Sequence, residues 1–259
     1  MKDLFDISGK VALVTGGSRG IGEMIAEAYV ANGVRTYISS RKAEVCDATA
    51  ARLSSMGECA SLPADLSTMQ GIDDLVGEIS SREDKLDILV NNAGTTWGAP
   101  IEDFPESGWD KIMNINVKSP FFLTKALLPL LENAASAENP ARIIMVGSID
   151  GLNVNSLPTF SYGPSKAAVH HLARTLAAHL ADRHITANAI APGLFPSKMT
   201  AATIHSFGEQ IRQGTPLKRH GKPEDMAGVA IYLASAAASF VTGVIIPVDG
   251  GITGAKSTL

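Results

Sequence analysis

The chain of 259 residues is 45% hydrophobic and 19% charged, a balance that excludes a disordered or collagen-like protein and allows a sizeable core. Its formal net charge of −4 disfavours nucleic acid and anionic membrane as partners, because both normally require a basic surface. The two cysteines have neither a disulfide framework nor metal-site spacing, and no apolar stretch reaches the roughly 20 residues that span a bilayer. We therefore expect a cytoplasmic protein that binds no metal, nucleic acid or membrane.

Short apolar runs alternate with helix-length segments along the whole chain. Strands are predicted at 11–14, 34–39, 59–62, 86–90, 142–147, 185–190 and 244–248, and helices at 20–32, 42–57, 69–84, 105–131, 161–181 and 223–236. Most of the strands are nearly continuous in apolar residues, as expected where helices cover both faces of a sheet. The pattern predicts a single Rossmann-like α/β domain over residues 1–259, with about seven parallel strands in a doubly wound sheet.

The segment that follows the predicted strand at 185–190 has no clear period. Residues 191–215 mix prolines with residues that are compatible with a helix. Ligands of open parallel sheets bind beyond the carboxyl ends of the strands, so a long segment that leaves this strand can cover a ligand. We predict that residues 194–215 form a substrate lid.

A glycine-rich turn follows the first predicted strand and opens the first predicted helix. The sequence TGGSRGIG at 15–22 places Gly16, Gly20 and Gly22 at the spacing T-G-x-x-x-G-x-G. Glycines permit close approach of the backbone to a pyrophosphate, and the helix N-terminus adds N–H donors and a positive dipole. An ordinary strand-to-helix turn is the alternative, but the flanking elements favour a dinucleotide site.

The end of the second predicted strand distinguishes between two dinucleotides. NAD sites usually place Asp or Glu there to accept from the ribose 2′-hydroxyl. This chain has YISSRK at 37–42, without a carboxylate, and Arg19 lies in the glycine turn. Because Arg19 and Arg41 match a 2′-phosphate in charge and geometry, we predict NADP(H). The alternative is that Arg41 and Lys42 only solvate the start of a helix.

Tyr162 and Lys166 stand four residues apart in SYGPSKAAVHHL and share one face of a helix. Pro164 fits this helix only within its first turn. A tyrosine acts as an acid or base near neutral pH if positive charge lowers its pKa from about 10, and Lys166 would supply such a charge. A Tyr–Lys pair at this spacing is more often a surface pair, so the surrounding motifs decide between the two readings.

Eight motifs follow one another in a fixed order. They are TGGSRGIG (15–22), ADL (64–66), NNAG (91–94), Asn116 in NINVKSPF, Ser148 in IIMVGS, YGPSK (162–166), APG (191–193) and VDGG (248–251). Each motif is common alone, whereas the eight in this order are specific. On these motifs the chain resembles the short-chain dehydrogenase/reductase family over essentially its whole length.

The resemblance implies four catalytic residues. Tyr162 would donate a proton to the carbonyl oxygen, and Ser148 would position that oxygen by hydrogen bonding. Lys166 would lower the pKa of Tyr162 and hold the nicotinamide ribose, while Asn116 would anchor a water for proton relay. The alternative readings are a helix-bulge residue for Asn116 and a strand-end hydroxyl for Ser148. The presence of all four residue types disfavours an inactive member of the family.

The resemblance also implies the residues that contact the cofactor. They are Gly16, Ser18, Arg19, Gly20, Ile21 and Gly22 in the glycine turn, Ser40 and Arg41 after the second strand, Asp65 and Leu66 near the adenine, Asn91, Ala93 and Gly94 near the adenosine-side ribose, and Tyr162, Lys166, Pro192, Gly193 and Ser197 around the nicotinamide.

Within this family the chain is most similar to NADPH-dependent 3-oxoacyl reductases, in particular the rhamnolipid-biosynthesis type, over 91–113, 127–144 and 191–200. The resemblance implies reduction of a ketone to a secondary alcohol by transfer of the pro-S hydride, with a 3-oxoacyl thioester as substrate. One alternative is a sugar, polyol or cyclic ketone as substrate. Another is a protein that senses dinucleotides without catalysis.

The resemblance bears on a carrier partner as well. Basic helix-end residues of fatty-acid-type reductases contact an acidic acyl carrier protein, and Arg183, with Arg142 nearby, would take this role. The other expected basic position reads ENPA at 138–141. An acyl carrier protein is therefore a doubtful partner, and acyl-CoA or another ketone stays open.

Three further expectations concern side chains outside these motifs. The adjacent His170 and His171 point about 100° apart on a helix, so we expect surface or subunit contacts rather than a metal site. Trp97 either walls the substrate pocket or packs on the core. The helices at 105–131 and 161–181 carry more apolar surface than one sheet face covers, so we expect a homotetramer, or at least a dimer.

Overall fold

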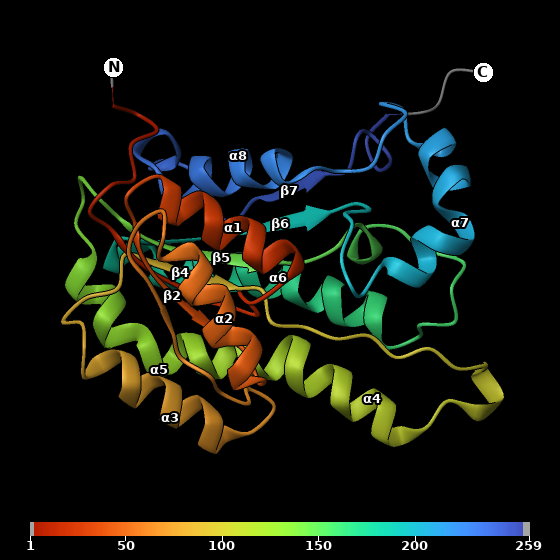
Figure 1. Cartoon of the computed structure of the whole chain (residues 1–259), viewed down its shortest axis with the longest axis horizontal. Helices are drawn as coiled ribbons and strands as arrows, with labels where there is room; N and C mark the ends of the chain where they lie inside the picture. The colour runs from red at the N-terminus through yellow and green to blue at the C-terminus, as the bar shows by residue number, and fades with distance from the viewer. Residues whose placement is uncertain (1–2, 256–259) are drawn as a thin grey trace.

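The computed structural model describes residues 3–255, in which a parallel sheet lies between two layers of helices (Figure 1). The strands are β1 (Val11–Thr15), β2 (Arg35–Ser39), β3 (Cys59–Ser61), β4 (Ile88–Asn91), β5 (Ala141–Val146), β6 (Ile185–Pro192) and β7 (Ile245–Val248). Their order is β3-β2-β1-β4-β5-β6-β7. The chain thus reverses its direction of winding between β1 and β4, and such switch points are where open sheets bind ligands. The predicted Rossmann-like fold is confirmed.

Helices cover both faces of the sheet, and each face has its own core. The helices are α1 (Gly20–Ala31), α2 (Ala43–Leu53), α3 (Met69–Ser80), α4 (Glu106–Met113), α5 (Ser119–Ala134), α6 (Tyr162–Leu180), α7 (Ala201–Gly214) and α8 (Pro223–Ala234). One core joins the sheet to α3, α5 and α6, and the other joins it to α1, α2 and α8. Every residue of β1, β4, β5 and β6 is buried, which explains their nearly continuous apolar sequences.

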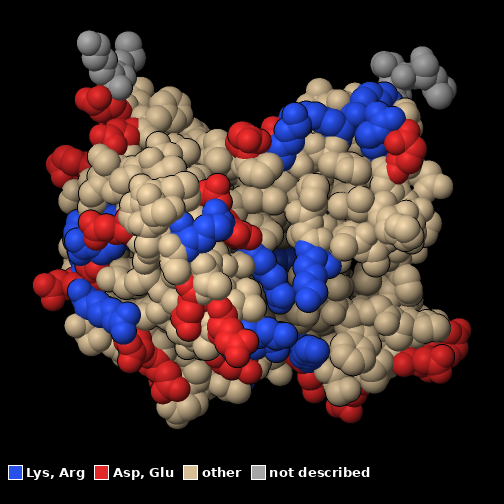
Figure 2. Space-filling view, in the orientation of Figure 1, with Lys and Arg blue, Asp and Glu red and all other residues tan. Residues whose placement is uncertain are grey.

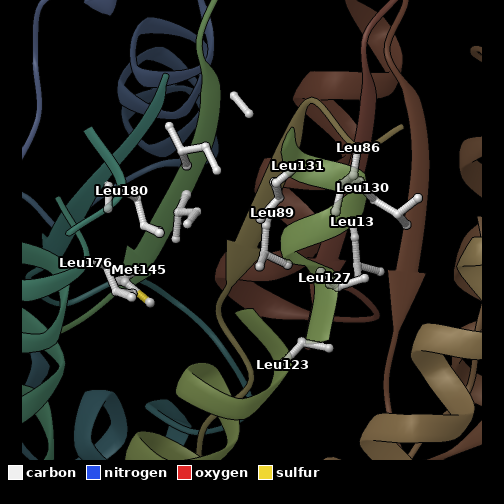
Figure 3. Close-up of a cluster of buried hydrophobic side chains, with 14 of the residues drawn as sticks. Leu13, Leu86, Leu89, Leu123, Leu127, Leu130, Leu131, Met145, Leu176 and Leu180 are labelled. Atoms are coloured by element: carbon white, nitrogen blue, oxygen red, sulfur yellow. The ribbon is translucent and has the colours of Figure 1, made fainter. Parts of the chain in front are cut away.

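Figure 3 shows the core beneath α5 and α6. Leu127 of α5 lies beside Leu13 of β1, and Leu123 and Leu89 belong to the same cluster. The spacing of four residues between Leu123 and Leu127 places them on one face of the helix. The burial of this face holds α5 against the switch point of the sheet.

The segment predicted as one helix at 105–131 differs from the prediction. It contains α4, a π-helical turn over Asn114–Lys118 and then α5, which continues to Ala134. A π turn carries an extra residue per turn, which the period of the apolar residues does not reveal, and such turns often occur at functional sites. The turn places the side chain of Asn116 in the interior.

The segment at 191–215, which has no clear period in the sequence, is ordered in two parts. Its first residues complete β6 at Pro192, and α7 begins at Ala201. In Figure 1, α7 stands apart from the two helical layers, beside the carboxyl end of β6. Among residues 3–255, no helix is long and apolar enough to cross a membrane, and no group of His, Cys, Asp and Glu side chains could hold a metal ion.

Candidate active site

The glycine turn between β1 and α1 is so tightly packed that side chains would not fit within it. Gly16 and Gly20 have φ values of +64° and +57°, in the left-handed region that favours glycine. A Cβ on Gly22 would lie 2.3 Å from the carbonyl oxygen of Gly16. The side chain of Arg19, the N-cap residue of α1, makes no capping hydrogen bond, so it satisfies none of the first N–H groups of the helix. This turn fits a pyrophosphate.

A residue that the sequence analysis did not single out, Asn92, holds the glycine turn in place. Its Nδ2 donates to the carbonyl oxygens of Thr15 (2.8 Å) and Gly16 (3.2 Å). The neighbouring Asn91 is buried, and its Nδ2 donates to Thr124 on α5 (3.1 Å). The Nδ2 of Asn91 is therefore directed at α5. The NNAG motif was the available signal for Asn92.

Serine hydroxyls without partners gather at the carboxyl ends of β2 and β3. Within residues 3–255, the Oγ atoms of Ser39, Ser40 and Ser61 are buried and have no hydrogen-bond partner. Exposed Arg41 directly follows Ser40, and exposed Arg19 lies in the glycine turn. In Figure 2, Lys and Arg side chains gather near the middle of the face, in the region where Figure 1 places the starts of α1 and α2. Unsatisfied hydroxyls beside cations fit the phosphorylated ribose of NADP.

Asp65 and Leu66 follow β3 in the loop before α3. Leu66 is buried, whereas Asp65 is exposed and its carboxylate accepts from the backbone N–H (3.0 Å) and the hydroxyl (2.7 Å) of Ser67. Desolvation raises the pKa of Asp65, but these hydrogen bonds and the charge of Arg41 outweigh it and lower the pKa overall. A charged Asp65 is thus held close to the expected adenine end of the site.

Helix α6 begins at Tyr162, with Pro164 in its first turn as predicted. Tyr162 lies close to Ser148, which follows β5, and the Ser148 side chain acts to lower the pKa of the phenol. Lys166, one turn further on, donates to the carbonyl oxygen of Val146 (2.9 Å), and its Nζ lies 5.7 Å from the centre of the Tyr162 ring. The sheet edge and α6 therefore bring the three predicted side chains together.

The acid–base properties of this group differ from the prediction. Burial raises the pKa of Tyr162 to about 12, and the nearby Asp150 adds to this, although the Ser148 side chain opposes it. Burial lowers the pKa of Lys166 to about 8. In the protein alone desolvation dominates and the pKa of Tyr162 is raised, and the lowering effect of Lys166 stays a prediction. A phenol with a raised pKa keeps the proton that reduction of a carbonyl needs.

Asn116 links the loop after β4 to α6. Its Oδ1 accepts from the N–H of Thr95 (2.9 Å), and its Nδ2 donates to the carbonyl oxygen of Thr95 (3.0 Å) and to Ser165 Oγ (2.9 Å). Ala93 and Gly94 lie just before this contact, and a Cβ on Gly94 would lie 3.3 Å from Asn116 Oδ1. Asn116 thus occupies a helix bulge, and its role as the anchor of a water stays a prediction.

The segment after β6 approaches the glycine turn from the other side. A Cβ on Gly193, next to Pro192, would lie 2.8 Å from the Cα of Asp249. A Cβ on Gly20 would lie 3.1 Å from the Cβ of Ser197. The start of the segment before α7 thus lies against the glycine turn. Ser197, expected near the nicotinamide, therefore lies beside the turn that is expected to hold the pyrophosphate.

Two expectations about basic side chains are wrong. His170 is not on the surface: it is 3% exposed and packs against Gly147 and Gly151. Arg142 is 1% exposed and donates to the carbonyl oxygen of Ser235 (3.0 Å), so it is not available to a carrier. The sequence places Arg142 in a predicted strand, but the strand pattern does not show that the arginine side chain is buried.

Arg183 lies beyond the far end of α6 from Tyr162, and Trp97 lies in the loop after β4. Arg183 is exposed and pairs with Glu132 (2.8 Å), so a carrier would have to compete with this carboxylate. The ring of Trp97 packs on Gly108 of α4, where a Cβ would lie 2.9 Å from it, and Lys111 lies over its face. Packing on a helix is thus the role that the contacts of Trp97 show.

These features define a class of protein: a dinucleotide-dependent oxidoreductase whose tyrosine, lysine and serine lie at the carboxyl edge of a doubly wound sheet. Comparison with known proteins agrees. A family model described as enoyl-(acyl carrier protein) reductase matches residues 16–253. A short-chain dehydrogenase/reductase of Diaporthe leptostromiformis is 33% identical over 96% of this chain and 93% of its own length. The chain belongs to the short-chain dehydrogenase/reductase family.

Three further similarities bear on the reaction that this family member could catalyse. The chain is similar to the rhamnolipids biosynthesis 3-oxoacyl-[acyl-carrier-protein] reductase of Pseudomonas aeruginosa, with 50% identity over 97% of this chain and 99% of the relative. It is also similar to the Pseudomonas aeruginosa RhlG/NADP active-site complex, with a TM-score of 0.94, 49% identity and coverage of 98% and 100%. The gluconate 5-dehydrogenase of Gluconobacter oxydans is 33% identical over 97% of both chains.

Proposed function

We propose that this protein catalyses the NADPH-dependent reduction of a 3-oxoacyl thioester to a 3-hydroxyacyl thioester. The observation that carries the proposal is the group of Ser148, Tyr162 and Lys166, which lies at the same sheet edge as the glycine turn. The 50% identity to a 3-oxoacyl reductase supports the substrate class.

Four side chains divide the work of catalysis. NADPH, when bound, supplies the hydride to the carbonyl carbon. Tyr162 donates its phenolic proton to the carbonyl oxygen, and Ser148 positions this oxygen by a hydrogen bond. Lys166 binds the nicotinamide ribose, and Asn116 holds the water through which Tyr162 is reprotonated. The raised pKa of Tyr162 keeps the proton in place until a substrate receives it.

The cofactor is NADP(H) rather than NAD(H). Arg19 and Arg41 bind the 2′-phosphate, and the unpartnered hydroxyl of Ser40 donates to it. No carboxylate stands at the end of β2 to accept from an unmodified 2′-hydroxyl. The remaining contacts are those implied by the family motifs, from the backbone of the glycine turn to Ser197.

The substrate site is bounded by apolar side chains. Leu152, Val154, Leu157 and Phe160, all exposed, lie in the segment that joins the Ser148 turn to Tyr162. We assign residues 194–215 as a lid, because α7 carries exposed Phe207 and its approach segment lies against the glycine turn. Apolar boundaries favour an acyl chain over a sugar or polyol.

The setting of the reaction follows from other features of the chain. The thioester carrier is coenzyme A rather than an acyl carrier protein, since Arg142 is buried and Arg183 pairs with Glu132. Cys46 and Cys59 are both free thiols, which favours the reducing cytoplasm. The whole chain acts as a single domain, in a homotetramer.

A screen of NADPH oxidation tests the proposal. The substrates are 3-oxoacyl-CoA esters of several lengths, the same acyl groups on a carrier protein, a cyclic ketone and 5-ketogluconate. We expect the highest kcat/KM with the CoA esters and much lower activity with NADH. A preference for 5-ketogluconate would favour the sugar-oxidising relatives instead, and the absence of turnover with every ketone would favour a dinucleotide sensor.

A further inference from the structure

A carboxylate that no catalytic role requires stands beside the proposed catalytic group. Asp150 lies two residues after Ser148, in a short 3-10 turn over Ile149–Gly151. Its backbone N–H donates to Ser148 Oγ (3.1 Å). Its carbonyl oxygen is 3.1 Å from the position that a Cβ would occupy on Gly163, next to Tyr162. The turn is therefore packed between Ser148 and the start of α6.

The charge of Asp150 has no cationic partner in direct contact. The side chain is half-buried and forms no salt bridge within residues 3–255. Desolvation raises its pKa overall, although Asn155 and the charge of Lys166 act to lower it. We take Asp150 as a carboxylate at neutral pH, because the ordinary pKa of an aspartate, about 3.9, lies about three units lower.

The other groups around this position do not cancel the charge. Lys166 donates to the carbonyl oxygen of Val146 and forms no salt bridge with Asp150, and burial lowers its pKa to about 8. His170 on the next turn stays neutral at pH 7, because burial and then Lys166 lower its pKa to about 4. A substrate whose carbonyl oxygen meets Tyr162 and Ser148 thus approaches a carboxylate that is only partly balanced.

We propose that Asp150 determines specificity by repelling ketones that carry an anionic group close to the carbonyl, such as free 3-oxo acids and keto-aldonates. Uncharged thioesters and esters avoid this repulsion. In a partly buried site, like charges several ångströms apart weaken binding on the order of 10- to 100-fold. The inference rests on the proposed reduction of ketones at this site, and it adds the class of ketones that the site rejects.

The test compares Asp150→Asn with the wild type on a matched pair of substrates, ethyl 3-oxohexanoate and 3-oxohexanoate. We expect the ratio of kcat/KM for the acid to that for the ester to rise about 10- to 100-fold in the variant, and to depend less on salt concentration. Asp150→Glu should keep the wild-type ratio within a few-fold. Asp182→Asn, which removes an exposed carboxylate beyond the far end of α6, should leave the ratio unchanged.

A binding measurement separates this inference from the proposed function. Calorimetry of hexanoate and hexanamide, added to the protein with NADPH, reports discrimination against the carboxylate without turnover. If neither ketone is reduced but Asp150→Asn strengthens hexanoate binding alone, the proposed reaction is wrong and the charge selection holds. If Asp150→Asn changes the two ligands and the two substrates equally, the inference is overturned. Urea unfolding of each variant confirms that it is folded.

Discussion

Among single residues, Tyr162 gives the most direct test of the proposed chemistry. Tyr162→Phe removes the proton donor and keeps the ring at the start of α6. Because general acid catalysis is typically worth about 10²–10⁴ in rate, we expect kcat to fall by that order. NADPH binding, followed by its fluorescence, should persist, since the phosphate contacts come from other elements.

The controls for this change lie in the same chain. Tyr232→Phe alters a tyrosine of α8, far along the chain from the site, and should leave kcat unchanged. Lys166→Ala should lower both kcat and the affinity for NADPH, because it removes a ribose contact. If Tyr162→Phe kept more than about a tenth of the wild-type kcat, against the expected ~10²–10⁴, another group would have to protonate the product.

Arg41 tests the choice of cofactor. Arg41→Ala removes one of the two guanidinium groups expected at the 2′-phosphate, and a charge-assisted hydrogen bond is worth about 1.5–3 kcal/mol. We therefore expect the KM for NADPH to rise about 10-fold or more, while the KM for NADH stays nearly constant. Arg82→Ala, which removes an exposed arginine paired with Glu78, serves as the control. A wild-type preference for NADH would refute the assignment.

His170 predicts how stability depends on pH. Its pKa is about 4 in the folded protein and 6.5 in the unfolded chain, because burial disfavours the cation. The unfolded chain therefore binds the proton first, so stability is unaffected above pH 6.5 and decreases as the pH falls from 6.5 toward 4. In urea unfolding, His170→Leu should reduce this decrease, whereas His171→Leu, at an exposed position, should not. Identical profiles for wild type and His170→Leu would contradict this account.

Sequence reasoning predicted the group of Tyr162, Lys166 and Ser148 from the Tyr–Lys spacing and from the motifs that the chain shares with a known family. It missed Asn92, whose role depends on two carbonyl oxygens 76 and 77 residues away. It also misplaced His170, because a histidine beside a second histidine looks like part of a polar face. Such contacts between distant segments, together with the desolvation that sets the pKa of Tyr162, appear only once the fold is known.

At the scale of elements, the apolar runs and the glycine motif predicted the strands and the glycine turn. The same signals did not predict the π turn at Asn114–Lys118. The turn inserts its extra residue inside a continuous helical pattern, and Pro120 at the start of α5 is the nearest local mark, which the sequence analysis did not use. Its effect is to direct Asn116 toward Thr95 and Ser165. Helix α5 must therefore hold its register on the sheet for the site to form.

That register depends on the apolar face of α5, which Leu127 tests. The side chain is fully buried between α5 and the strands (Figure 3), and Leu→Ala changes at such positions typically cost about 2–5 kcal/mol of unfolding free energy. We expect this loss in urea unfolding of Leu127→Ala. Lys125→Ala, on the exposed side of α5, should change the free energy by about 0.5 kcal/mol or less. Equal effects of the two changes would show that α5 is not anchored by this face.

At the scale of the whole molecule, the order of the strands explains why distant motifs form one site. Crossing from β3 back to β4 places the glycine turn after β1 beside the loops after β4 and β5. Residues that are separated by more than a hundred positions then meet at one edge of the sheet. The alternation of strands and helices predicted this topology, because parallel sheets with right-handed crossovers allow few others.

Assembly is the remaining prediction at this scale. Trp109 of α4 and Phe121 of α5 are 43% and 41% exposed, although both belong to helices that pack on the sheet. Large apolar side chains on neighbouring helices favour a symmetric interface, in which the same surface of two copies meets across a two-fold axis. We expect light scattering at micromolar concentration to give the mass of a tetramer, or at least of a dimer.

Phe121→Glu should lower this mass, because it places a charge in the interface. Met56→Glu, at an exposed apolar position after α2, should leave it unchanged. A monomeric mass for the wild type would mean that these side chains serve another partner or none.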